Sequence, residues 1–217
     1  MDMKGSIAAI KDAITKSAAE RTSPEVISAA YAVVHLIGGV LLASARLLGA
    51  AGPFGMAAVA ASGAGLNGVA ALIGAAIGYI ISCGLAGSIR YLAAIVLVYT
   101  ISFAFQDTKL ASKSVFAPAT AAVSALSTGI LSSFTSVFTQ APAAAVVLIE
   151  TVFSFGGCWF FREAMSSRER TTESEELRYA GSVLITAAVL LMAVSQIEIF
   201  GAISLGRLAA VLVVMTC

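Results

Sequence analysis

The chain has 217 residues, of which 59% are hydrophobic and only 12% are charged, with a mean hydropathy of +0.96 and a formal net charge of +1. A soluble domain usually carries about twice that charged fraction. A chain with so little charge has too few polar groups to cover its own surface in water. The composition therefore excludes an ordinary soluble domain and favours a chain whose outer surface faces lipid.

Long stretches without any charged residue support a membrane location. A helix needs about 20 apolar residues to cross the roughly 30 Å hydrocarbon core. A straight helix of 43 residues would be about 65 Å long, so the longest stretch must fold back. A large soluble helical protein with buried helices is the alternative, but stretches this long are typical of membrane spans. The charge-free stretches are residues 26–45, 47–89, 91–106, 114–149 and 179–197.

The pattern indicates helices rather than a transmembrane barrel. The apolar stretches are continuous, whereas barrel strands are about ten residues long and alternate with a period of two. A helix also satisfies its backbone hydrogen bonds within its own segment, as the bilayer core requires. We predict an all-α, polytopic transmembrane helix bundle with about eight spans.

Prolines, glycines and polar clusters divide the chain into these spans. Pro24 precedes the first, and Pro53 opens the second, because proline suits the first turn of a helix. The second span is short, so a re-entrant helix is the alternative to a full crossing. A charged linker, residues 162–178, precedes the seventh span. The predicted spans are 26–45, 53–66, 69–86, 91–105, 115–137, 143–161, 179–197 and a last one beginning near residue 199.

The distribution of Lys and Arg predicts the orientation. If all eight spans cross and the N-terminus is cytoplasmic, residues 1–25 and the loops 106–114 and 162–178 lie inside. These segments hold ten of the thirteen Lys and Arg residues (four, two and four), as the positive-inside rule expects. Omitting the second span would place six of the ten outside. We therefore predict a multi-pass protein of the bacterial inner (cytoplasmic) membrane.

The first 25 residues contain isoleucines at positions 7, 10 and 14, with charged residues between them. This spacing indicates a short amphipathic helix on the inner membrane surface or on the bundle, and no cleavable signal. We therefore divide the chain into a cytoplasmic segment, residues 1–25, and a transmembrane domain, residues 26–217.

Three polar residues within apolar segments are candidates for chemistry. Glu150 lies well inside the sixth span, and an intramembrane carboxylate suggests a proton or cation site unless it is neutralised or hydrogen-bonded in the bundle. Arg207, in the last span, is a possible partner for Glu150. His35 is alone in the first span and fits an ordinary hydrogen-bonded interior position. Arg46 lies at a span end, where its side chain can reach the interface, an ion or substrate contact being the alternative.

Other reactive residues form no known pattern. Cys83, Cys158 and Cys217 lie far apart in apolar segments and predict neither a metal site nor a disulfide framework. No nucleotide, zinc or nucleophile-elbow motif occurs. We therefore assign no catalytic, cofactor-binding or metal-binding residue. The linker 162–178 mixes both signs of charge, as a solvated helical linker does, with a docking surface as the alternative.

One packing pattern runs along the third span. Small residues recur every fourth position, which lets a neighbouring backbone approach closely, within the chain or in a dimer. These residues are Ala70, Gly74, Gly78, Ser82 and Ala86.

A family resemblance extends this interpretation. The stretch "ARLLGAAGPFGMA", with Arg46 upstream of Pro53, Phe54 and Gly55, resembles the N-terminal membrane region of stage II sporulation protein E. The charged loop containing "SEEL" before the seventh span and the stretch "GAISLGRLAAVLVVM" follow the same order. The similarity extends over nearly the whole chain from about residue 25.

The resemblance implies a membrane anchor in a larger protein. Members of that family have about ten transmembrane helices, a central cytoplasmic region and a metal-dependent serine/threonine phosphatase domain of the PP2C type. The phosphatase activates the forespore sigma factor after asymmetric division, and the membrane region holds the protein at the septum and supports self-association. The middle region engages the division machinery.

The resemblance also implies that this chain is a fragment, because it stops at Cys217 within an apolar stretch. Manganese or magnesium is expected only in the missing phosphatase domain, and this chain is expected to be no enzyme. The predicted partners are the lipid bilayer and other copies, with no nucleic acid. The alternative function is a small secondary transporter or permease subunit that uses Glu150, His35 and Arg207.

Overall fold

A computed structural model describes residues 24–47, 50–134, 144–166, 172–196, 198–199 and 203–204. The described chain is helical apart from two pairs of two-residue antiparallel strands. The predicted amphipathic segment 1–25 falls outside the described residues except for its last two. The elements are α2 (Pro24–Ser44), β1 (Arg46–Leu47), β2 (Ala50–Ala51), α3 (Phe54–Ser62), α4 (Leu66–Phe105), α5 (Phe116–Phe134), α6 (Ala144–Ala164), α7 (Glu173–Ser195), β3 (Glu198–Ile199) and β4 (Ile203–Ser204).

Four helices, α2, α4, α6 and α7, are long and apolar enough to cross a membrane, while the apolar part of α5 is shorter. Large apolar side chains are exposed on these helices, as expected where lipid replaces water. Eight spans are not supported among the described residues. α3 is too short to cross alone, and the predicted last span lies almost wholly outside the described residues.

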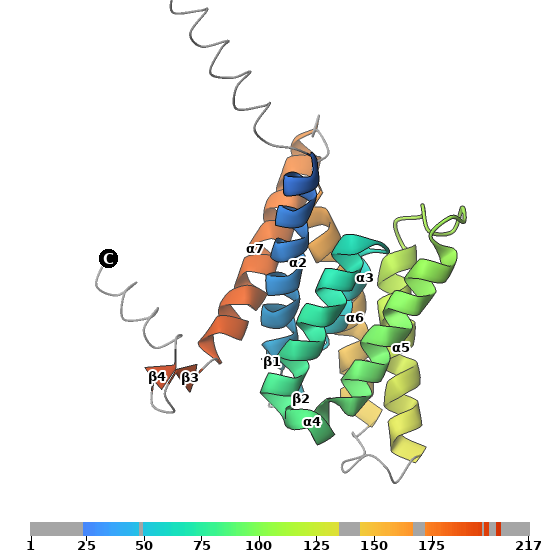
Figure 1. Cartoon of the computed structure of the whole chain (residues 1–217). Helices are drawn as coiled ribbons and strands as arrows, with labels where there is room; N and C mark the ends of the chain where they lie inside the picture. The colour runs from blue at the N-terminus through green and yellow to red at the C-terminus, as the bar shows by residue number, and fades with distance from the viewer. Residues whose placement is uncertain are drawn as a thin grey trace, which may run out of the picture.

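The helix α4 contains a reversal of the chain at Gly84. This residue has φ 70° and ψ 170°, a conformation that an L side chain rarely adopts. The rings of Tyr79 and Tyr91 stack with centroids 4.9 Å apart, whereas twelve residues of straight helix would separate them by about 18 Å. The chain therefore folds back into two arms (Figure 1).

α2 and the first arm of α4 run parallel. Leu36 lies against Gly74 and Val40 against Gly78, so residue numbers increase in the same direction along both helices. A methyl group at either glycine would overlap the carbonyl oxygen of its partner in α2. Because the two helices are parallel, the segment between them must return the chain to the starting end of the bundle.

α3 makes part of this return. It has nine residues and is only about 14 Å long, less than half of the hydrocarbon core. It runs antiparallel to the first arm of α4, because Tyr79 lies at its beginning while Gly68 lies against Gly63 beyond its end. Residues 54–60 are all buried. The predicted full span 53–66 is thus a short, enclosed helix, since residues 63–65 end it.

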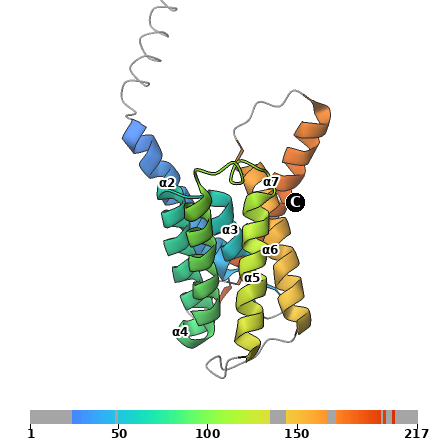
Figure 2. The same cartoon turned by 90° about the vertical axis from the view of Figure 1, so that its right-hand side faces the viewer.

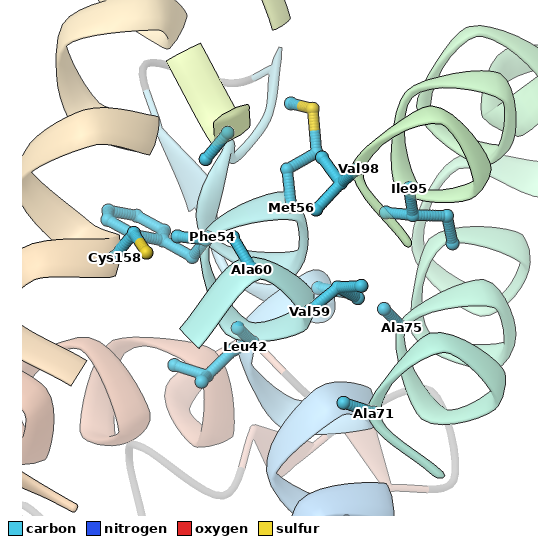
Figure 3. Packing of buried hydrophobic residues seen from close by; sticks show 14 of the residues in the cluster. Leu42, Phe54, Met56, Val59, Ala60, Ala71, Ala75, Ile95, Val98 and Cys158 are labelled. Atoms are coloured by element: carbon cyan, nitrogen blue, oxygen red, sulfur yellow. The ribbon is translucent and has the colours of Figure 1, made fainter. Parts of the chain in front are cut away.

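The core surrounds α3. Figure 3 shows its side chains pointing toward α2, α4 and α6. Alanines fill much of this interior, which lets the neighbouring backbones approach α3 closely. The buried cluster includes Leu42, Phe54, Met56, Val59, Ala71, Ala75, Ile95, Val98 and Cys158.

α7 begins at Glu173, before the predicted span 179–197, because three acidic residues in its first turn favour a helix N-terminus. The last span does not begin near Ile199, since Ile199 pairs with Ile203 in a strand pair.

Candidate functional site

The candidate site is a buried ion pair between Arg90 and Glu150. Glu150 lies on α6 with 3% of its surface exposed, and Arg90 lies on the second arm of α4 with 8% exposed. The Nη2 atom of Arg90 contacts the Oε2 atom of Glu150. Arg207, the possible partner named from the sequence, lies outside the described residues.

The reversal at Gly84 explains why Arg90 is buried. The second arm begins directly after this glycine, so Arg90 lies nearly two turns into it rather than at its end. α6 packs on α3 and α5, and Val147 and Glu150 are among its buried residues. The chain thus brings together two ionisable side chains from different apolar segments.

Tyr91 supplies the second contact to the carboxylate. Its hydroxyl donates a hydrogen bond to Oε1 of Glu150 over 2.8 Å. The guanidinium carbon of Arg90 lies 4.8 Å from the centroid of the Tyr91 ring, within the range of a cation–π interaction. Both oxygens of Glu150 therefore have partners, which offsets part of the cost of burying a charge.

Tyr79 extends the cluster to α3. Its ring stacks on Tyr91 at an interplanar angle of 17°. Its hydroxyl donates to the carbonyl oxygen of Gly52 over 3.1 Å and accepts the backbone N–H of Met56 over 3.3 Å. A continuous series of contacts thus joins α6 to the first turn of α3. The N–H of Met56 is one of the groups that a helix leaves unpaired at its N-terminus.

Some buried polar atoms near this series have no hydrogen-bond partner among the described residues. They are the Nε of Arg90 and the hydroxyls of Ser124 and Ser154. Ser154 lies one helical turn after Glu150 on α6, and Ser124 lies on α5. No group of three His, Cys, Asp or Glu that could hold a metal ion occurs in the described part of the chain.

The Pro-Phe-Gly motif forms the beginning of α3. Pro53 is buried immediately before the helix. The Phe54 ring packs edge-on against Phe153, with centroids 6.1 Å apart, and also contacts Phe161 at 6.4 Å. A methyl group at Gly55 would lie 2.7 Å from the Tyr79 ring. The motif therefore joins α3 to α6 through an aromatic ring and to α4 through a residue without a side chain.

Arg46 forms hydrogen bonds to two parts of the chain that are distant from it in sequence. Its guanidinium donates to the carbonyl oxygen of Ser82, near the end of the first arm of α4. Its backbone N–H donates to Oε1 of Gln196 over 2.8 Å, and Nε2 of Gln196 donates back over 3.1 Å. The side chain is exposed, but it is also a link between α4 and the end of α7.

The small-residue stripe does not extend over all five positions. Gly74 and Gly78 face α2, and Ala70 is buried, so these contacts are within the chain. Ser82 is half-buried. Ala86 is exposed and lies beyond the reversal at Gly84, so it is not on the same helical face.

Other candidate residues lie apart from the ion pair. His35 is half-buried on α2, and its Nδ1 lies 2.8 Å from the carbonyl oxygen of Tyr31 in the same helix. Cys83 and Cys158 are free thiols, and Cys217 lies outside the described residues.

The charged linker is partly helical, and residues 167–171 of it are not described. Arg162 donates to the carbonyl oxygen of Ser114 over 3.1 Å, and Arg178 pairs with Glu163 over 3.1 Å. Both contacts lie at the end of the bundle where α6 ends and α7 begins (Figure 2).

Sequence reasoning missed Arg90, Tyr91 and Tyr79 as site residues. One signal was present, because Arg90 is the only charged residue between Arg46 and Asp107. Comparison with known proteins adds no identification, since no family model, curated protein or solved structure matches this chain.

Proposed function

We propose that this chain is the membrane anchor and assembly domain of a sporulation phosphatase of the stage II sporulation protein E kind. The observation that carries the proposal is the role of the quoted motif. Arg46, Phe54 and Gly55 each make a specific contact that fixes α3 or its approach. Packing at the centre of a fold is enough to preserve such a motif in a family, so the motif needs no catalytic role.

The arrangement of the helices supports the proposed orientation. Figure 2 shows four features at one end of the bundle: the start of α2, the loop 106–114, the end of α6 and the start of α7. The described basic residues of these segments therefore share one end, as the positive-inside rule expects of a cytoplasmic face. We propose a cytoplasmic N-terminus in a bacterial inner membrane, with α3 making the return that the second predicted span would make.

The proposed partners are lipid and other copies of the chain. Contact with the division machinery, septal localisation and the manganese- or magnesium-dependent phosphatase would belong to regions beyond this chain. The anchor itself would then be no enzyme.

The test has two parts. Sequencing the gene past codon 217 should show the remaining spans and a phosphatase domain; a stop codon after one short span would contradict the proposal. A fluorescent fusion of the natural full-length protein should gather at the asymmetric septum of sporulating cells. Replacing this region with an unrelated membrane anchor should abolish that localisation, and unchanged localisation would overturn the assigned role.

A small transporter is the second candidate. It is favoured by the buried Arg90–Glu150 pair and by the hydroxyls of Ser124 and Ser154, which have no hydrogen-bond partner within the described part of the chain. Polar groups inside a membrane often mark substrate or ion pathways. The contacts of Glu150 weaken this reading, because a carboxylate already paired with an arginine and a tyrosine hydroxyl is not a free proton carrier.

A double variant separates the two candidates better than a single one. Glu150→Gln alone leaves the Arg90 charge buried without its partner, so a loss of function could result from misfolding. Arg90→Met combined with Glu150→Met removes both charges and keeps apolar packing. An anchor with this double change should still localise in cells, whereas a transporter should lose uptake in reconstituted vesicles.

A further inference from the structure

α7 presents an apolar seam on the side that faces away from the bundle. Ser182 and Ala193, its buried residues, are 1% and 0% exposed and lie on one side of the helix. At 100° per residue, Leu184 lies about 200° around the helix axis from Ser182. Leu177, Leu184 and Leu191 are 76%, 73% and 64% exposed. These leucines therefore lie on the side of α7 opposite its two buried residues.

The seam alternates large and small residues. Its members follow one another at intervals of four, three, four and three residues, and all are exposed. No atom lies within 4 Å of the position that a Cβ on Gly181 would take. Leucines separated by small residues are the pattern of a helix that receives another helix, since the small residues form the holes into which side chains insert. We define the outer seam as Leu177, Gly181, Leu184, Ala188 and Leu191.

The chain itself supplies a matching segment. β3 pairs with β4 in antiparallel register, Glu198 with Ser204, so the chain reverses direction directly after α7. Residues 205–217 follow, and as a helix they would be about 20 Å long, against about 21 Å from Leu177 to Leu191. Short connections join antiparallel neighbours in helical bundles.

The sequence of this segment has the same pattern as the seam. On a helix, Leu205, Ala209, Leu212 and Thr216 would share one face at intervals of four, three and four residues. Arg207 would lie about 200° from Leu205, on the opposite side. Large residues of one seam would then lie opposite small residues of the other.

We propose that residues 205–217 of the same chain form a helix that docks antiparallel on the outer seam of α7. α7 would then be an interior helix between the described bundle and this segment. The proposal does not depend on the sporulation assignment, because it uses only the seam, the strand pair and the pattern of the following residues.

Cysteine cross-linking of the full chain in native membranes tests the proposal. In a background with Cys83, Cys158 and Cys217 each changed to Ala, Ala188→Cys is combined with Leu212→Cys. The register of the strand pair places position 212 opposite the stretch between Ala188 and Leu191. A disulfide needs Cα atoms within about 7 Å, so mild oxidation should form it only if the two helices are docked.

We expect oxidation to remove most of the maleimide labelling of both cysteines, with no change in the apparent mass of the chain. The matched control combines Leu212→Cys with Thr186→Cys, which lies on the bundle side of α7, and should keep its labelling. A disulfide between two chains would show that a second copy occupies the seam and would overturn the proposal. Full labelling after oxidation would show a lipid-facing seam and would overturn it equally.

A stability measurement gives a second readout. Ala188→Leu should lower the melting temperature of the detergent-solubilised chain, because it fills a hole that the docked helix occupies. The control Ala187→Leu, also exposed but to one side of the seam, should not. Equal melting temperatures for the two variants would contradict docking.

Discussion

α3 and α7 are both apolar helices, yet one is enclosed by the bundle and the other lies at its edge. α3 has nine residues, and its first seven are buried. α7 has 23 residues, of which only Ser182 and Ala193 are buried. Hydrophobicity alone therefore does not decide which helix is interior in this protein. Small side chains and polar contacts decide it, because lipid is as apolar as the bundle interior.

Among the contacts tested below, the buried ion pair should contribute most to the stability of the bundle interior. Glu150→Gln leaves Arg90 buried without a charge partner, and breaking a buried pair in this way costs about 3–5 kcal/mol. Thermal unfolding of the variant in detergent should show this loss of stability. The Arg90→Met and Glu150→Met double variant should recover much of it. A double variant no more stable than the single one would show that the pair does not carry the cost.

Gly55 is the next position to test the enclosure of α3. Gly55→Val should force the Tyr79 ring away and cost roughly 1–3 kcal/mol, as overpacking of a core does. Thermal melting beside Gly156→Val, on α6 with no atom within 4 Å of a Cβ, gives the matched comparison. Equal effects of the two changes would mean that Tyr79 does not pack on α3.

Gly84 tests the reversal that places Arg90 inside the bundle. Gly84→Ala introduces a side chain at φ 70° and should cost about 1–3 kcal/mol of backbone strain. Gly38→Ala, with no atom near its Cβ and an ordinary helical position, should be neutral or stabilising. If the two variants melt at the same temperature, the second arm does not depend on this conformation.

Tyr79→Phe should have the smallest effect of the four. It keeps the stack on Tyr91 but removes the hydroxyl that contacts Gly52 and Met56, at a cost of about 1 kcal/mol. Hydrogen exchange at the Met56 amide should rise in the variant. Tyr31→Phe, on the exposed face of α2, is the control. Unchanged exchange at Met56 would show that the hydroxyl does not hold the start of α3.

Local sequence patterns predicted much of the helix map. Pro24 marks the start of α2, and the 43-residue charge-free stretch required a reversal, which the structure places at residues 63–65, with a further reversal at Gly84. The site was predicted only in part. Glu150 was identified because a carboxylate in an apolar segment is conspicuous, but its partner was not, because the position of Arg90 depends on where the chain turns.

By itself, the sequence determined the apolar character of the chain, the helical class and the presence of a carboxylate inside it. These follow from composition and from the need of an apolar environment to have backbone groups paired within each segment. Only the tertiary structure decided which helices are parallel, that α3 is enclosed, and that Glu150 meets Arg90 and Tyr91. Such contacts join residues far apart in the chain, and local patterns do not specify which apolar surfaces will meet.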